Sequence, residues 1–125
     1  MNSRARQLWL GVGCTLVLLV IVLSLAPISV PVPVEEGDKV GHVAAYAALM
    51  LWFANLYETL NRRSRLAIGF VALGVALEFV QGWTGYRTFE VADMAADAFG
   101  VAVGWALAPP RLPNFLQGIE KFVRS

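Results

Sequence analysis

Ionisable and amide side chains recur at helical spacing in three separate apolar segments of the sequence. They are Asp38, Lys39 and His42 in the first segment, Glu78 and Gln81 in the second, and Asp93 and Asp97 in the third. Spacings of three and four residues place the members of each set on one face of a helix. A histidine that meets buried carboxylates shares a proton near neutral pH, which is the requirement for general acid/base chemistry.

We assign these side chains two roles. The predicted catalytic residues are His42, Glu78, Asp93 and Asp97. The predicted ligand-binding residues are Lys39, Arg87, Gln81 and Asp38. The two basic side chains, Lys39 and Arg87, would hold a phosphate or pyrophosphate, since Lys and Arg are the usual partners of that group. The set therefore predicts acid/base chemistry next to a bound anion.

The composition defines the medium in which this chemistry would take place. The chain has 125 residues, of which 58% are hydrophobic and 15% charged, with a net charge of +1. Soluble domains carry about 25% charged residues, so an ordinary soluble domain is excluded. A net charge near zero provides no field for nucleic acid, and we expect no nucleic-acid partner. The single cysteine, Cys14, cannot form an internal disulfide.

The apolar residues are gathered into four blocks, each about as long as the roughly 20 residues that cross a bilayer. The blocks cover residues 8–26, 40–57, 66–83 and 91–108. We therefore predict an all-α fold, a bundle of four transmembrane helices that forms a single integral membrane domain over residues 1–125. The first block is preceded by Arg4 and Arg6 as in a signal peptide, but its apolar run is longer than is normal for one.

Two further patterns complete the predicted architecture. Pro109 and Pro110 end the fourth block, and residues 112–124 then place apolar side chains near one helical face. This pattern predicts a short amphipathic helix lying in the inner membrane interface. Gly100 and Gly104 form a small-residue stripe on the fourth helix, which indicates close contact between helices.

The distribution of basic residues predicts the orientation. Eight of the ten lie in the amino end, the turn at 58–65 and the tail, namely Arg4, Arg6, Arg62, Arg63, Arg65, Arg111, Lys121 and Arg124. Because cytoplasmic loops are rich in Lys and Arg, we expect both termini to be cytoplasmic. The polar side chains of the spans then lie in the outer third of the bilayer. A charge at a helix centre costs roughly 2.5–3.5 kcal/mol, so the polar faces should turn toward one another in a shared, outward-facing pocket.

The same residues resemble those of the VanZ-like family of small membrane proteins. The matching pattern is Asp38-Lys39-x-x-His42, Glu78-x-x-Gln81, Arg87, Asp93 and Asp97-x-x-Gly100-x-x-x-Gly104. The resemblance implies a setting in the bacterial inner membrane and an association with low-level teicoplanin resistance. Asp97 departs from the pattern, because the family commonly has Asn at that position.

Three functions are consistent with this sequence. The leading hypothesis is a pocket that binds, and modifies by acid/base catalysis, an anionic envelope lipid or a lipid-linked cell-wall precursor; its partners are membrane lipids, and we expect no cofactor. The second is an intramembrane metal site, because one His and three carboxylates could ligate Zn or Mn, although no paired-His motif is present. The third is a polar latch that fixes the register of the helices without a ligand.

Overall fold

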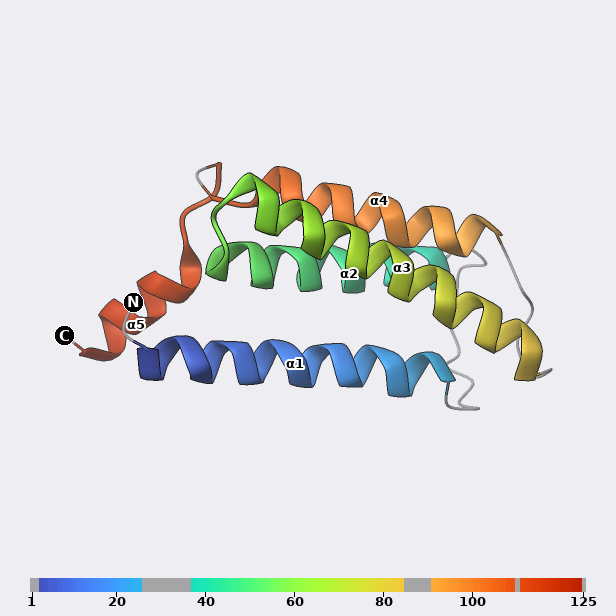
Figure 1. Cartoon of the computed structure of the whole chain (residues 1–125), viewed down its shortest axis with the longest axis horizontal. Coiled ribbons are helices and arrows are strands. Elements are labelled where there is room, and N and C mark those ends of the chain that lie inside the picture. The colour runs from blue at the N-terminus through green and yellow to red at the C-terminus, as the bar shows by residue number, and fades with distance from the viewer. Residues whose placement is uncertain (1–2, 26–36, 85–90, 110, 125) are drawn as a thin grey trace.

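The computed structural model describes residues 3–25, 37–84, 91–109 and 111–124, and these residues form five helices (Figure 1). The helices are α1 (Ser3–Leu25), α2 (Gly37–Leu56), α3 (Leu60–Thr84), α4 (Val91–Leu107) and α5 (Phe115–Arg124). The described residues contain no strand. The prediction of an all-α fold is therefore confirmed for this part of the chain.

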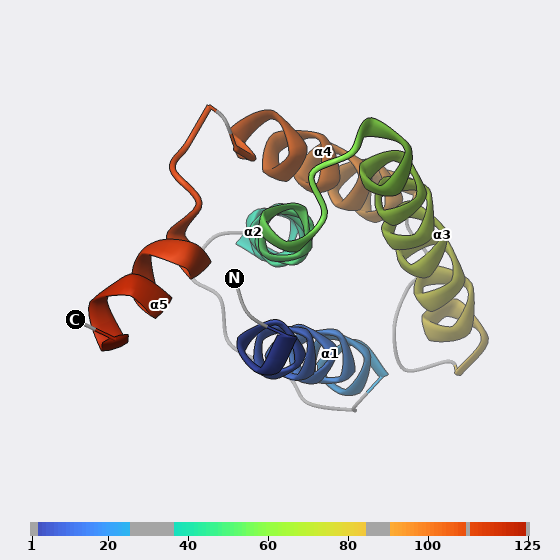
Figure 2. The same ribbon diagram turned by 60° about the vertical axis from the view of Figure 1, so that its left-hand side comes forward.

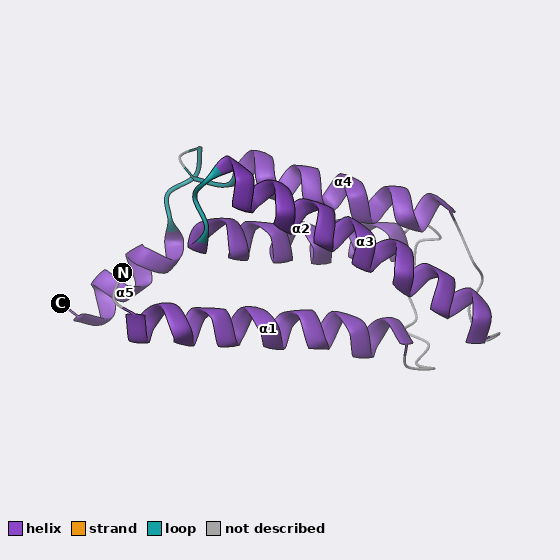
Figure 3. Ribbon diagram, viewed as in Figure 1, coloured by secondary structure: helices purple, strands orange, loops and turns teal. Residues whose placement is uncertain are grey.

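Four long helices run side by side, and α2 lies among the other three (Figures 1 and 2). The most extensive packing joins α2 to α4, and α4 also packs against α3. The short helix α5 extends from one end of this bundle. Both termini and the loops that join α2 to α3 and α4 to α5 lie at that same end, which we call the terminal end (Figure 3).

Two glycines allow the close contact between α2 and α4. A Cβ atom added at Gly100 would lie 2.5 Å from the Val43 carbonyl oxygen, and one added at Gly104 would lie 2.5 Å from the Ala47 carbonyl oxygen. Both distances are far below van der Waals contact. The small-residue stripe of the sequence is thus the surface on which the backbone of α2 rests.

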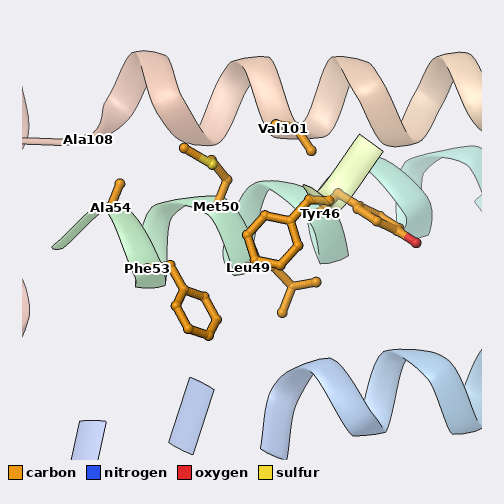
Figure 4. Packing of buried hydrophobic residues seen from close by; sticks show 8 residues of the cluster. Tyr46, Leu49, Met50, Phe53, Ala54, Val101 and Ala108 are labelled. Atoms are coloured by element: carbon orange, nitrogen blue, oxygen red, sulfur yellow. The ribbon is translucent and has the colours of Figure 1, made fainter. Parts of the chain in front are cut away.

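The apolar core is built around α2. Met50 lies between α2 and α4 near Val101, whereas Phe53 projects toward α1 (Figure 4). The Phe53 ring reaches the backbone of α1 at Gly13, where an added Cβ would lie 2.7 Å from the ring. Small residues on α1 and α4 therefore receive the large side chains of α2 on two sides.

Helix α3 begins at Leu60, six residues before the span predicted at 66–83. Its first turn is closed by Thr59, whose Oγ1 accepts a hydrogen bond from the Arg62 backbone N–H at 3.3 Å, an arrangement typical of a helix N-cap. Arginine is also a good helix former. The predicted turn at 58–65 is therefore largely the start of α3, and Arg62, Arg63 and Arg65 lie on a helix.

Helix α5 is attached to the bundle by its first residues. The Asn114 Oδ1 accepts a hydrogen bond from the Gln117 backbone N–H at 3.1 Å, while Asn114 Nδ2 donates to the Asn55 carbonyl at 2.9 Å. Leu116 is fully buried, but Phe122 is 81% exposed. The amphipathic tail predicted at 112–124 is helical from Phe115 onward, and its outer apolar side chains lie on the surface.

Two of the described helical segments are long and apolar enough to cross a membrane, Ser3–Leu25 and Leu60–Trp83. Large apolar side chains on α1 face outward, since Leu18 is 62% and Val22 is 58% exposed. Such exposure is unfavourable in water and natural in contact with lipid. Neither α2 nor α4 meets the same criterion of length and hydropathy.

Candidate functional site

The polar site begins with a histidine and an aspartate from two helices. His42 Nδ1, on the first part of α2, lies 2.6 Å from Asp97 Oδ1 on α4. The side chains are 15% and 3% exposed respectively. An ionised Asp97 accepts a hydrogen bond from the Nδ1–H of a neutral imidazole, which then carries its lone pair on Nε2. This geometry orients His42 as a base.

Helix α3 leaves room for the Asp97 carboxylate by having a glycine opposite it. A Cβ atom added at Gly74 would lie 2.7 Å from Asp97 Oδ2. Gly74 also lies one turn before Glu78, so both face the same side of α3. Our sequence interpretation missed Gly74. The available signal was a glycine four residues before Glu78, and therefore on the same face of the helix.

Tyr46 is a second component that our sequence interpretation missed. It is 3% exposed and lies one turn after His42 on α2. Its phenol lies within electrostatic range of the carboxyl groups of Asp97 and Glu78. Glu78 itself is 1% exposed. Helices α2, α3 and α4 therefore each place a polar side chain around one buried position.

The remaining predicted residues differ in where they lie. Asp93 is buried one turn before Asp97 on α4. Gln81 is buried, and its Nε2 donates a hydrogen bond to the Ser24 carbonyl at 2.7 Å, which joins α3 to the last turn of α1. Lys39 is half-buried three residues before His42. The Gln81 amide thus makes a contact between helices, in addition to any role it has toward a ligand.

The structure does not describe the side chains of two predicted ligand-binding residues. Arg87 is not among the described residues, and Asp38 belongs to α2 but its side chain is not described. Their assignment to the site stays a prediction from the sequence.

The site is rich in carboxyl groups, which are common ligands of metal ions. Among the described residues, no group of three His, Cys, Asp or Glu side chains is arranged to hold a metal ion. The hypothesis of an intramembrane metal site therefore receives no support from the side chains whose positions are known. The pairing of His42 with Asp97 favours proton transfer.

The helical fold, the two apolar helices and the exposed apolar side chains of α1 together indicate a membrane protein. The family model for VanZ/LLP1 matches residues 6–115. Because this match covers most of the sequence, the chain belongs to the VanZ/LLP1 family.

A curated relative was also found. The chain is similar to an uncharacterized protein of Schizosaccharomyces pombe, with 30% identity over 110 residues that make up 86% of this chain. The match spans 66% of the length of that relative. No solved structure matches the chain significantly.

Proposed function

We propose that this protein is a multi-pass membrane protein whose His42–Asp97 pair, with Glu78, forms an acid/base site for the phosphorylated headgroup of an envelope lipid or lipid-linked cell-wall precursor. The observation that carries the proposal is the 2.6 Å contact between His42 Nδ1 and Asp97 Oδ1. An oriented imidazole beside a buried carboxylate is the arrangement by which proteins commonly move a proton during acyl or phosphoryl transfer.

This proposal implies a proton path that uses the second ring nitrogen of His42. When water attacks the phosphorus atom, His42 Nε2 accepts the water proton, and Asp97 stabilises the imidazolium ion that forms. The same proton is returned to the leaving oxygen when the bond from phosphorus to that oxygen breaks. Glu78, which is buried near Tyr46, is the second acid of the site.

An anionic headgroup requires positive charge near these carboxylates. Lys39 lies three residues before His42 on α2 and is half-buried, and Arg87 is the second basic residue that we assign to the headgroup. Both would contact phosphate oxygens, Arg87 through two parallel hydrogen bonds. This assignment predicts that binding depends on headgroup charge.

The membrane orientation extends the proposal. We infer that α1 to α4 all cross the membrane, with the terminal end in the cytoplasm and the His42 site near the outer surface of a bacterial inner membrane. The concentration of Lys and Arg at the terminal end supports this direction. A site at the outer surface would account for a link to teicoplanin resistance, because glycopeptides act outside that membrane.

The first experiment measures binding. The purified chain is reconstituted in phosphatidylcholine nanodiscs, and its melting temperature is followed as undecaprenyl pyrophosphate is added. A ligand that binds only the folded state raises the melting temperature by mass action. We expect a rise with undecaprenyl pyrophosphate that is lost in Arg87→Ala and reduced in Lys39→Gln. An equal rise in wild type and Arg87→Ala would contradict headgroup binding.

The second experiment measures chemistry and separates it from a polar latch. Release of inorganic phosphate from undecaprenyl pyrophosphate is compared in wild type, His42→Ala and Glu78→Gln. Loss of a general acid or base lowers the rate by about 10²–10⁴-fold. Thr15→Ala serves as a control, since the Thr15 hydroxyl bonds only within α1, to the Gly11 carbonyl. A latch without a ligand predicts instead that the variants lose melting temperature and that wild type releases no phosphate.

A further inference from the structure

A cavity lies far from the His42 site, at the terminal end of the bundle. It has a volume of about 600 Å³ and lies among α1, α2 and α3, within the roughly 300–1,000 Å³ typical of ligand pockets. Its walls are mostly apolar and include Val17, Phe53, Phe70 and Leu73. Helices α1 and α3 diverge toward this end (Figures 1 and 2), which explains why the space is open.

The rim of this cavity is basic. Arg62 and Arg65, on the first turns of α3, belong to its lining together with Tyr57. The guanidinium carbon of Arg6 lies 4.7 Å from the centroid of the Tyr57 ring, and that of Arg62 lies 5.6 Å from it. Arg62 and Arg65 thus line the apolar opening, and Arg6 lies beside it on the Tyr57 ring.

The positive charge of this rim is not balanced within the part of the chain that the structure describes. No described carboxylate forms an ion pair with Arg6, Arg62 or Arg65. Like charges held around one ring repel each other, and an anion placed among them relieves that repulsion. The rim therefore has the charge that complements a phosphate group.

We propose that this cavity binds an anionic glycerophospholipid of the inner leaflet, with one acyl chain among the apolar side chains and the phosphate at Arg62 and Arg65. Guanidinium groups bind phosphate oxygens through paired hydrogen bonds, and the apolar walls suit a hydrocarbon chain. A protein segment would satisfy the walls but gives no reason for the three arginines. The uncompensated charge therefore selects an anionic lipid.

The proposal is independent of any activity at His42. Phe53 in the cavity wall lies eleven positions after His42 on α2, which corresponds to about 16.5 Å along the helix axis. Loss of one site should leave the other intact. The two proposals can therefore fail separately.

The experiment compares lipids that differ only in headgroup. The purified full chain in detergent is titrated with palmitoyl-oleoyl phosphatidylglycerol or with phosphatidylcholine of the same chains, and bound lipid is counted by native mass spectrometry. A basic side chain near a lipid surface contributes about fivefold in affinity. The double variant Arg62→Gln/Arg65→Gln should weaken phosphatidylglycerol binding by about 25-fold. Arg111→Gln, an exposed arginine near the same end but outside the cavity lining, should not weaken it.

A second variant tests where the acyl chain lies. Gly69 belongs to the cavity lining, and a Cβ atom added there meets nothing within 4 Å. Gly69→Leu should fill the cavity without displacing the backbone and abolish tight binding of phosphatidylglycerol. Gly11→Leu is the matched control, because Gly11 is equally open but lies outside this lining. The melting temperature in lipid-free detergent checks that each variant folds.

Several outcomes of these experiments would contradict the proposal. Equal affinity for the two lipids, or unchanged binding in the double variant, would exclude recognition of the headgroup at this rim. Unchanged binding in Gly69→Leu would exclude the cavity, and a dimer that Gly69→Leu dissociates would identify a second copy as its occupant. Loss of binding in Asp97→Asn would indicate that the lipid binds at the His42 site and not in this cavity.

Discussion

Arg63 shows how one side chain secures the terminal end of the bundle. It is 8% exposed and donates three hydrogen bonds of 2.8 Å, to the carbonyl oxygens of Tyr57, Pro109 and Ala54. Ala54 lies in the last turn of α2, Tyr57 directly follows α2, and Pro109 follows α4. The helix dipole concentrates negative charge at these carboxyl ends. The sequence suggests only a cytoplasmic basic residue at this position. In the structure it is a buried cap for two helices.

We expect Arg63→Lys to lower the free energy of unfolding by about 3 kcal/mol, although it preserves the charge. A lysine cannot reproduce the planar fork that reaches three carbonyls, and each lost hydrogen bond to a charged group costs about 1.5–3 kcal/mol. Unfolding in a denaturing detergent, monitored by circular dichroism, measures the change. Arg62→Lys is the control, since that side chain is exposed and its guanidinium bonds to no carbonyl among the described residues. Equal losses in the two variants would mean that Arg63 is not a cap.

The polar site was partly predictable at this scale. Within each segment, spacings of three and four residues indicated which polar side chains share a face of a helix. The structure buries those of Glu78 and Asp97. Tyr46 and Gly74 were missed, because their importance depends on which helix lies opposite. A sequence shows which residues share a face of a helix, but it does not show which faces meet.

At the scale of helices, the contact between α2 and α4 decides whether the polar site forms. Gly100 lies three residues after Asp97, and the backbone of α2 rests directly on it. Any side chain at this position would meet the Val43 carbonyl oxygen, which cannot rotate away. The close approach of these two helices therefore sets the distance between His42 and Asp97.

We expect Gly100→Ala or Gly104→Ala to lower the free energy of unfolding by about 1–3 kcal/mol, the usual cost of overpacking. The helices must separate to admit the methyl group, so we also expect weaker binding of the ligand at His42. Thermal unfolding in nanodiscs and the headgroup titration measure the two effects. Gly69→Ala and Gly11→Ala are controls, because an added Cβ at either position meets nothing within 4 Å. A similar loss in all four variants would indicate a general disruption of the fold and would contradict the importance of this contact, because Gly→Ala by itself favours a helix.

The positions of the helices were predictable, but their ends were less so. Apolar runs marked the interiors of all four long helices, because lipid or core burial requires them. The starts of α1 and α3 extend into the basic flanks, to Ser3 and Leu60. Hydropathy does not detect such turns, since they are polar and are stabilised by a cap such as Thr59.

On the scale of the whole molecule, the two ends of the bundle differ in charge. The end that begins α2 holds the buried carboxyl groups, whereas the terminal end holds Arg63 and the basic rim at Arg62 and Arg65. Such an asymmetry commonly fixes the orientation of a membrane protein, and it supports the orientation that we propose. The sequence predicted the direction of the asymmetry. The cavity between α1 and α3 was not predictable, because it arises from the angle at which these helices diverge.

Cysteine labelling tests the orientation. Cys14 is the one cysteine of the sequence, so Cys14→Ser gives a background on which single cysteines report their side of the membrane. Asn61→Cys and Gln117→Cys lie at exposed positions of the terminal end, and Ala92→Cys lies at an exposed position on the first turn of α4. In intact spheroplasts, a membrane-impermeant maleimide should modify Ala92→Cys and should modify the other two only after permeabilisation. Labelling of Asn61→Cys before permeabilisation would show that the orientation is the reverse of the one proposed, with the His42 site on the cytoplasmic side. Labelling on opposite sides for Asn61→Cys and Gln117→Cys would mean that α3 and α4 do not both cross the bilayer.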